Sequence, residues 1–295
     1  MNFFLLIVKI EKIFFLQCCK IIILIVIKLK IYWLSQCFFV KCNFVIIQVS
    51  KMEVGKNNIE NENYCIVCGN ELIHLVNSVS AVCSFCEKTF SADFACNENH
   101  YVCNDCLHLE PKEIVKIVCL RSTKTDPIDL AKEIMASPAI KMHGPEHHFI
   151  TPAVLLTTVA NYTNSRSGLE ERIQRAEELA TKFAPNCSWH LGTCGAALGA
   201  SIFLIVWNNL EPNNEASWDE GNYIVSNSLK RIAELGSPRC CKRDTYIAIE
   251  EATEYLRKKY GINLPVSEAK CDFSLRNRTC KHEDCIFFNL KYSLV

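Results

Sequence analysis

The sequence has no excess of charge of either sign, because its 295 residues include 32 lysines and arginines and 32 aspartates and glutamates. A basic surface over the whole protein, as many nucleic-acid-binding proteins have, is therefore excluded, although local basic patches are not. The sequence also lacks a G-x-G-x-x-G motif after a strand and a G-x4-G-K-[ST] motif, so neither a dinucleotide-binding fold nor a P-loop has support. The length allows one medium domain and a small module.

The first 51 residues contain no Gly, Ala, Pro, Arg, Asp, Thr or His and are rich in Ile, Phe, Leu and Lys. They lack the cationic start, single apolar block and small-residue cleavage site of a signal peptide. Lysines interrupt the segment, and its longest uncharged run, Ile31–Val40, is about half of the roughly 20 residues that a spanning helix needs. We expect residues 1–51 to be a non-native extension, with Met52 as the true start. The alternative is a cationic apolar segment at a membrane surface.

Cysteine, in contrast, is abundant, with 19 residues. A disulfide framework is typical of short secreted chains with an even number of cysteines. Here the number is odd and several cysteines form C-x2-C pairs. The pattern therefore favours metal ligation in a reducing compartment, and we expect a cytoplasmic protein.

Four pairs of potential metal ligands lie close together in the first half of the chain. They are Cys65 with Cys68, Cys83 with Cys86, Cys96 with His100, and Cys103 with Cys106. The x2 spacing lets both thiolates of a tight turn reach one ion, and four such ligands complete a tetrahedral zinc site. Eight ligands therefore predict two structural zinc ions, with iron–sulfur ligation as the alternative.

The spacing does not decide how these pairs combine. A RING-like arrangement would join Cys65, Cys68, Cys96 and His100 at one ion and Cys83, Cys86, Cys103 and Cys106 at the other. Sequential pairing is the competitor, and His108 could replace His100. Such a module folds because metal replaces a core, so its default function is structural or partner-binding. Few Lys or Arg residues lie between Cys65 and Cys106, which argues against a nucleic-acid partner.

After residue 110 the chain shows helical periodicity and no alternation of strands and helices. One helix is expected to start at Asp126-Pro127 and stop near Ser137, another to start at Thr151-Pro152, and a last one to start at Asp244 and stop at Gly261. Three further helices are expected over 168–183, 193–207 and 222–235, the last of them closed by Gly236. The predicted fold is a mainly α-helical domain preceded by a small zinc-stabilised module, RING-like or zinc-ribbon-like. The predicted boundaries are a flexible lead-in at 52–64, a two-zinc module at 65–108, an all-α domain at 110–262 and a cysteine-rich tail at 263–295 packed on that domain.

A second constellation of cysteines and histidines lies in loops of the helical region. The loops supply His143, Glu146, His147 and His148; Cys187, His190 and Cys194; Cys240 and Cys241; and, in the tail, Cys271, Cys280 and Cys285. Each of the first three loops approaches a helix N-terminus, where the helix dipole favours thiolates and anions. We expect Gly144-Pro145 to prevent a continuous helix, so that the histidines gather in a turn.

The tail has three cysteines and lacks a fourth ligand, which Cys240 or Cys241 could supply. The resulting four-thiolate site would suit zinc, a third metal, or a [4Fe-4S] cluster. The other cysteine of the doublet, or Cys187 or Cys194, would remain available for chemistry.

The remaining polar side chains of these loops are candidates for catalysis and substrate binding. Expected acid–base groups or additional ligands are His143, Glu146 and His147, and expected substrate-binding or thiolate-stabilising groups are His148, Arg239, Lys242 and Arg243. The structural alternatives are a hydrogen-bonded histidine turn and surface charge around two inert thiols. The small residues Gly192, Gly195, Ala196, Gly199 and Ala200 are expected to permit close helix packing rather than to bind phosphate, and Cys119 is expected to be a buried apolar residue.

Several motifs together resemble a family of domains of unknown function found in anaerobic bacteria and archaea. They are CIVCG, HYVCNDC, MHGPEHH, GTCGAALGASI, SPRCCKRD and the tail spacing C-x8-C-x4-C. The resemblance extends from about Tyr64 to the C-terminus and implies no established activity. Some members carry a methyltransferase label, but no glycine-rich S-adenosylmethionine loop is present here.

The leading hypothesis is a cytoplasmic metalloprotein of unknown substrate. Two structural zinc ions would accompany a second Cys/His centre, holding a metal or an iron–sulfur cluster, for redox or thiol-dependent chemistry. One alternative is a non-enzymatic zinc-binding adaptor. Another, suggested by the anaerobic distribution of the family, is an enzyme or accessory factor in one-carbon or corrinoid methyl transfer. We expect a small-molecule or protein partner, no nucleic acid and no membrane span.

Overall fold

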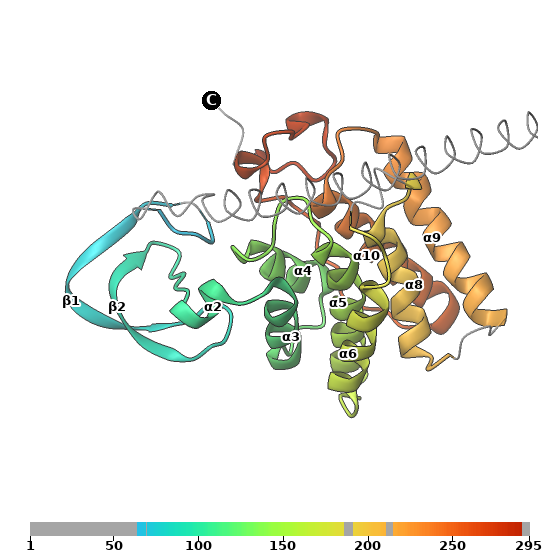
Figure 1. The fold of residues 1–295 in the computed structure, drawn as a ribbon, viewed down its shortest axis with the longest axis horizontal. Coiled ribbons are helices and arrows are strands. Elements are labelled where there is room, and N and C mark those ends of the chain that lie inside the picture. Colours follow the sequence, from blue (N-terminus) through green and yellow to red (C-terminus); the bar gives the residue numbers. More distant parts are fainter. Residues whose placement is uncertain (1–63, 69, 186–190, 211–214, 291–295) are drawn as a thin grey trace, which may run out of the picture. The chain divides into compact units, whose positions relative to one another are not determined.

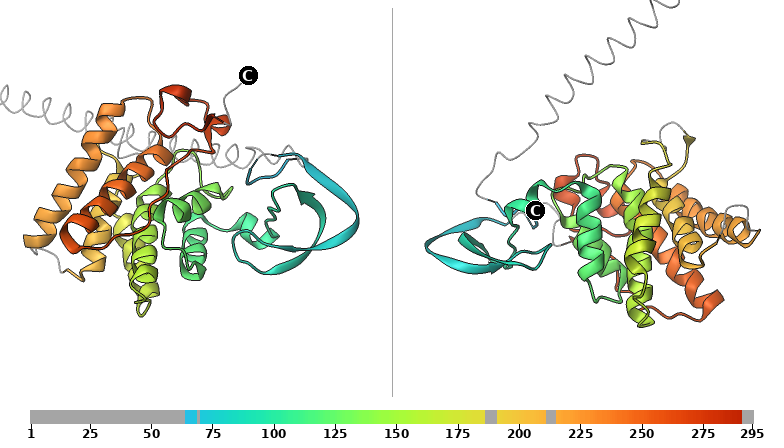
Figure 2. Two further views of the ribbon diagram at one scale, coloured as in Figure 1. Left: turned by 180° about the vertical axis from the view of Figure 1, so that it is seen from behind. Right: turned by 60° about the horizontal axis from the view of Figure 1, so that its bottom comes forward.

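The computed structural model describes residues 64–68, 70–185, 191–210 and 215–290. The described part of the chain has eight α-helices, and a mainly helical domain follows a small two-strand region (Figures 1 and 2), which confirms the predicted fold class. The predictions for residues 1–51 and for the lead-in up to residue 63 lie outside the described residues. Of the helices described, none combines the length and the apolar character needed to cross a membrane.

The two-strand region is an antiparallel hairpin of β1 (Leu72–Val82) and β2 (Thr89–Cys96), followed by the short helix α2 (Asn104–His108). The register runs from Leu72 opposite Cys96 to Val82 opposite Thr89. Most side chains of β1 are exposed, so the strands bury little apolar surface of their own. An isolated hairpin is at best marginally stable in water, which is the situation in which bound metal can replace a core.

The helical domain begins with α3 (Pro111–Arg121) and α4 (Pro127–Ala136), each of which has proline in its first turn. Proline is favoured there because the first N–H groups of a helix have no intrahelical partner. Asp126 caps α4, since its Oδ1 accepts hydrogen bonds from the N–H groups of Ile128 at 2.8 Å and Asp129 at 3.2 Å. This start agrees with the sequence prediction.

The next helix, α5 (Glu146–Tyr162), begins six residues earlier than predicted, so Thr151 and Pro152 are interior residues. The expectation that Gly144-Pro145 would keep the histidines in a turn was also wrong, because His147 and His148 lie in the first turn of α5. An interior proline costs a helix about 3 kcal/mol. Burial offsets this cost, because every residue from 147 to 160 is buried.

Two further helices pack against α5. The amphipathic helix α6 (Leu169–Ala180) lies within the predicted range 168–183, and the apolar helix α8 (Gly195–Trp207) lies within 193–207. Helix α8 contacts α5, α6, α9 and α10 and is the central helix of the domain. At Gly199 a Cβ atom would lie 2.9 Å from the carbonyl oxygen of His148 and from Cβ of Thr151. The small residues of α8 therefore permit close helix packing, as expected.

The last two helices are α9 (Glu215–Leu235) and α10 (Cys241–Tyr260). Each is followed by a glycine with positive φ, Gly236 at 65° and Gly261 at 68°, a conformation that ends helices and that glycine adopts without strain. Helix α9 starts seven residues before the predicted Asn222. The prediction that Asp244 caps α10 was wrong, because Cys240 is the N-cap and Asp244 lies in the first turn.

The tail returns across the helices in short irregular pieces that include η1 (Ser274–Arg276) and η2 (His282–Asp284). The Ser267 N–H donates to Asp126 Oδ2 at 2.7 Å, and Lys281 Nζ donates to the Leu235 carbonyl at 2.6 Å. The rings of Tyr246 and Phe287 meet edge to face at 5.4 Å. These contacts hold the tail against the start of α4, the end of α9 and the N-terminal half of α10.

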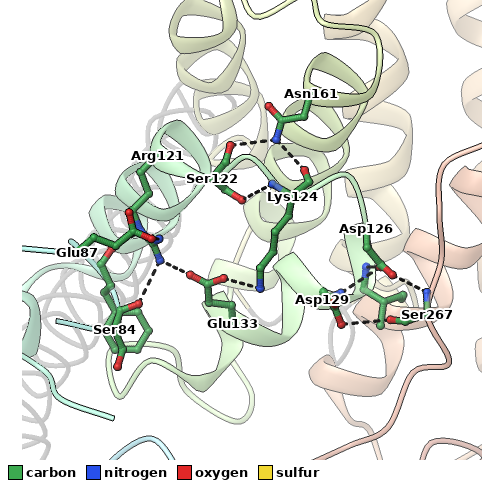
Figure 3. A network of polar contacts seen from close by, with 12 residues as sticks. Ser84, Glu87, Arg121, Ser122, Lys124, Asp126, Asp129, Glu133, Asn161 and Ser267 are labelled. Atoms are coloured by element: carbon green, nitrogen blue, oxygen red, sulfur yellow. Dashed lines mark hydrogen bonds and ion pairs between the residues drawn. The ribbon is translucent and has the colours of Figure 1, made fainter. Parts of the chain in front are cut away.

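A polar network centred on Arg121 connects the two-strand region to the helices (Figure 3). The guanidinium donates to the carbonyl oxygens of Phe85, at 2.5 Å, and Ser84, at 3.1 Å. It also forms ion pairs with Glu87 and Glu133. One side chain of α3 therefore binds both the loop between the strands and α4.

Candidate metal centres

Two groups of four Cys/His side chains lie in and around the hairpin. They are Cys65, Cys68, Cys96 and His100, and Cys83, Cys86, Cys103 and Cys106. In each group the potential ligand atoms all lie within 4.8 Å of one another, so each could hold a metal ion. We call them the first and second tetrads. The structure thus brings the pairs together in the interleaved combination rather than the sequential one.

The sulfur positions in both tetrads match a tetrahedral ion. The Sγ atoms of Cys68 and Cys96 are 3.5 Å apart, and those of Cys86 and Cys103 are 3.8 Å apart. Zinc–sulfur bonds of about 2.3 Å in a tetrahedron place sulfurs about 3.8 Å from each other. His100 Nδ1 lies 3.8 Å from Cys96 Sγ, whereas His108 is exposed and its Nδ1 lies 2.8 Å from the Asn104 carbonyl oxygen.

Backbone N–H groups point at the sulfurs of the second tetrad. The Cys103 N–H donates to Cys83 Sγ at 3.4 Å, and the Cys106 N–H donates to Cys103 Sγ at 3.5 Å. Burial opposes ionisation of Cys83, but the N–H groups of Cys103, Cys86 and Phe85 outweigh it and lower the pKa of this thiol to about 7. Cys83 is therefore the cysteine of this tetrad that most readily forms the thiolate, the form that binds metal, whereas burial raises the pKa of Cys103 and Cys106.

The cysteine doublet at the start of α10 faces two separate cavities. Cys240 lines one together with the tail cysteines Cys271, Cys280 and Cys285, and we call it the tail cavity. Cys241 lines the other, between the first turns of α5, α8 and α10, and we call it the helix-start cavity. Each has a volume of about 20 Å³, far below the roughly 300–1,000 Å³ of small-molecule pockets.

The structure brings Cys240, rather than Cys241, to the three tail cysteines. The Phe273 N–H donates to Cys271 Sγ at 3.4 Å, and the His282 N–H donates to Cys280 Sγ at 3.3 Å. This is the N–H to sulfur arrangement already seen in the second tetrad. The four sulfurs are not as compact as the tetrads, since they do not form a group with all Sγ atoms within 4.8 Å.

Two buried hydroxyl groups also line the tail cavity. Tyr246 and Ser274 are at most 2% exposed, and neither hydroxyl has a hydrogen-bond partner among the residues that the structure describes. Burial raises the pKa of Tyr246 well above its usual value, so its hydroxyl keeps its proton and remains a donor. A buried hydroxyl without a partner costs about 1–3 kcal/mol, so both groups favour an acceptor in the cavity, whether sulfur or water.

The helix-start cavity is lined by His147, His148, Cys194, Cys241 and Asp244, together with Arg239. Each of the three predicted Cys/His loops before the tail therefore contributes at least one residue to this cavity. Cys187 and His190, which belong to the same loop as Cys194, lie outside the described residues.

The basic residues after the doublet are buried, which excludes the alternative of surface charge around inert thiols. Lys242 is 1% exposed and Arg243 is 4% exposed. Lys242 Nζ donates to the Met135 carbonyl at 2.9 Å and lies 4.8 Å from the Phe273 ring centre. Burial lowers its pKa to about 7. Of the predicted anion-binding residues, Arg239 lines the helix-start cavity and Arg243 the tail cavity, while Lys242 lines neither.

Two predicted acid–base residues lie beside the cavities without lining them. His143 Nε2 is 3.3 Å from Asn277 Oδ1, and Asn277 Nδ2 in turn donates to Cys240 Sγ at 3.8 Å. Glu146 folds back over its own loop, where Oε1 accepts the Lys141 N–H at 2.9 Å. His143 therefore contacts the tail cavity through Asn277, and Glu146 stabilises the loop that starts α5.

Residues 115–288, more than half of the chain, match a family described as a family of unknown function, DUF5714. The chain belongs to DUF5714. The DUF5714 match contains both cavities, whereas the two tetrads lie before Val115, although the sequence resemblance was expected to begin near Tyr64. No curated protein and no solved structure matches the chain.

Sequence reasoning missed three residues of the DUF5714 cavities. Asp244 lines the helix-start cavity, and Tyr246 and Ser274 line the tail cavity. Helical spacing was the available signal for Asp244, because residues three apart share a face of a helix and Asp244 follows Cys241 by three. No comparable signal marked Ser274, which only the path of the tail brings to the cavity.

Proposed function

We propose that this DUF5714 protein is a metalloprotein in which the two tetrads hold structural zinc and the tail cavity holds a [4Fe-4S] cluster for redox chemistry. The observation that carries this proposal is the meeting of Cys240 with Cys271, Cys280 and Cys285 at one cavity. Four thiolates are the usual ligands of such a cluster. The donors come from two segments of the chain, so cluster binding would also fasten the tail to α10.

Zinc is the metal that the tetrads favour. Their donors are cysteine sulfurs and one imidazole nitrogen, and four-coordinate sites with these donors typically bind zinc. The short sulfur separations leave room for a single ion. Because every position is taken by a protein ligand, the role of both ions would be structural.

Two features of the tail cavity favour a cluster over a single ion, although its volume of about 20 Å³ means that the tail must move outward as a cluster binds. Each cysteine of a cluster bonds a different iron, so the four sulfurs are held farther apart than around one zinc ion. The sulfurs of the tail cavity are indeed less compact than those of the tetrads. In addition, the hydroxyls of Tyr246 and Ser274 need acceptors, which the inorganic sulfides of a cluster provide and a zinc ion does not.

The buried position of the site also suits redox chemistry. Hydrogen bonds to sulfur and shielding from solvent set the reduction potential of a cluster, and the Asn277 amide already donates to Cys240 Sγ. Arg243 lines the same cavity, so a positive charge would offset part of the negative charge of a cluster ligated by four thiolates.

Anaerobic purification followed by iron, sulfide and zinc analysis tests the proposal. We expect four iron and four sulfide ions per chain and a broad visible absorbance that bleaches with dithionite. Cys271→Ser should lose the iron, the sulfide and the absorbance, and should keep its zinc. The matched control is Cys119→Ala, because Cys119 is fully buried in the core away from both cavities and should leave iron unchanged. Zinc without sulfide or visible absorbance would refute the cluster and leave the zinc-binding adaptor as the better interpretation.

A further inference from the structure

The helix-start cavity contains a second, separate set of metal donors. It is lined by one imidazole, two thiols and one carboxyl group, which belong to His147, Cys194, Cys241 and Asp244. His147 is 1% exposed and Asp244 is 2% exposed. The donors come from the first turns of α5 and α10 and from the N-cap of α8, so only the folded domain brings them together.

The histidine in this set has the hydrogen-bonding pattern of a metal ligand. His147 Nδ1 lies 3.1 Å from the carbonyl oxygen of Gly144, which can only accept, so Nδ1 carries the ring proton. The lone pair is then on Nε2, which is buried and has no hydrogen-bond partner within the described part of the chain. Metal-bound histidines usually donate their second nitrogen to a backbone carbonyl or carboxylate in this way.

The carboxylate and one thiol are already adjacent. Cys194 Sγ donates to Asp244 Oδ2 at 3.6 Å, while Arg243 Nε donates to Asp244 Oδ1 at 3.1 Å. Arg243 thus fixes the carboxylate so that its other oxygen faces the thiol. The carboxylate of Asp244 is held by Arg243 in the first turn of α10, and the thiol of Cys194 is held at the start of α8, where Cys194 is the N-cap.

Three helix starts favour negative ligands at this point. Helices α5, α8 and α10 have 17, 13 and 20 residues, and none of their N-cap residues forms a side-chain capping bond. Burial raises the pKa of the Cys194 thiol, to about 12, and that of Cys241, and the positive ends of these dipoles offset part of that effect. The starts of α5 and α8 are also in tight contact, because a Cβ atom at Gly195 would lie 2.0 Å from the His148 ring.

We propose that His147 Nε2, Cys194 Sγ, Cys241 Sγ and Asp244 Oδ2 form a third mononuclear metal site, and that its ion is zinc. Mixed imidazole, thiolate and carboxylate donors are characteristic of zinc. The cavity of about 20 Å³ suits an ion rather than an organic ligand. No three of these donors lie within 4.8 Å of one another in the structure, so the side chains have to turn inward to bind an ion.

The charge of such a site is nearly balanced. Two thiolates and a carboxylate carry three negative charges against two on the ion, and Arg243 contacts the same carboxylate. The site shares no metal donor with the tail cavity, although Arg243 lies beside both, so its metal binding can be tested separately from that of the cluster proposed there.

Zinc stoichiometry of the full-length protein tests this site. Zinc is added to the anaerobically purified protein in competition with a colorimetric chelator. The wild type should bind three zinc ions per chain, and His147→Gln and Cys194→Ser should each bind two. Iron and sulfide should not change in either variant. The matched control is His108→Gln, because His108 is exposed and outside both tetrads, and it should keep the wild-type stoichiometry.

The same measurement separates the two proposals. If the tail cavity binds zinc instead of a cluster, the wild type binds four equivalents, yet His147→Gln still binds one fewer. Equal zinc binding by wild type, His147→Gln and Cys194→Ser would overturn the third site, as would a loss of iron instead of zinc. Far-UV circular dichroism verifies that the variants fold, and replacement of zinc by cobalt should show weaker thiolate charge-transfer absorption in Cys194→Ser than in the wild type.

Discussion

Cys240 and Cys241 are neighbours in the chain, yet their side chains line different cavities. Cys240 is the N-cap of α10 and has an extended backbone (φ −141°, ψ 104°), whereas Cys241 is the first helical residue. Cys241 shares its face with Asp244, three residues later, whereas Cys240 shares its face with Arg243. The change from extended to helical backbone at the start of α10 thus assigns one thiol to each cavity.

The two thiols should therefore have separable effects. We expect Cys240→Ser to lose iron and sulfide while keeping all of its zinc, and Cys241→Ser to lose one zinc while keeping its iron. The physical reason is that each sulfur faces a different set of donors. Elemental analysis of the two variants, purified side by side under anaerobic conditions, provides the comparison. Identical metal content in the two variants would contradict the separation.

Each tetrad should bind one ion independently of the helical domain. Cys68→Ser and Cys86→Ser should each lower zinc content by one equivalent, since each removes one ligand of a different tetrad. The hairpin buries little apolar surface, so loss of its metal should unfold it locally. Limited proteolysis should then cut between residues 64 and 110, while the helical circular dichroism remains. Protection of this region in both metal-depleted variants would show that the hairpin is stable without zinc.

The unpaired hydroxyl of Tyr246 should tune the proposed cluster. Tyr246→Phe removes a hydrogen-bond donor without changing the ring that packs against Phe287. Hydrogen bonds to cluster sulfur favour the more negative, reduced state, so we expect a lower reduction potential at unchanged iron content. Redox titration followed by visible absorbance measures this shift. Tyr223→Phe, at an exposed position of α9, is the control and should leave the potential as in the wild type.

Close packing of α5 and α8 should make Gly199 intolerant of any side chain. In Gly199→Ala the new methyl group would meet the backbone oxygen of His148 at 2.9 Å, and overpacking of this kind costs about 1–3 kcal/mol. At Gly221 the nearest atom is the Ser201 hydroxyl, at 2.7 Å, which can rotate away. Gly221→Ala should therefore be neutral or stabilising by about 0.5–1 kcal/mol through helix propensity. Chemical denaturation of both variants measures the difference, and equal stabilities would contradict the tight contact.

Arg121 should hold the two-strand region against the helices. Arg121→Met removes its bonds to the Phe85 and Ser84 carbonyls and its ion pairs with Glu87 and Glu133 (Figure 3). The side chain is 18% exposed, so water replaces part of the lost contacts, and we expect a cost of about 2–3 kcal/mol. Amide hydrogen exchange in residues 83–90 should be faster in Arg121→Met than in the wild type, which measures this loss of stability. Arg257→Met removes an exposed ion pair with Glu254 and should have no measurable effect, so a similar response of both variants would contradict the prediction.

Capping residues in the sequence were sufficient to predict the start of α4 and the end of α10. Asp126 with Pro127 marked the start of α4, and Gly261 marked the end of α10, because capping bonds and positive φ involve only neighbouring residues. The same rules failed at Pro152, which lies inside α5. There the burial of almost the whole helix against its neighbours outweighs the local cost of proline, and burial of that kind cannot be seen in a short stretch of sequence.

The cysteine spacings by themselves determined the seven cysteine ligands of the tetrads, six of them because a C-x2-C turn brings its own two sulfurs together, and left the eighth ligand open between His100 and His108. They did not determine which pairs share an ion, nor which cysteine of the doublet meets the tail. Tertiary structure decided both: the pairing of β1 with β2 interleaves the tetrads, and the rotation of α10 directs Cys240 and Cys241 to different cavities. Spacing constrains ligands within one turn, whereas contacts between distant segments depend on how the helices and strands pack.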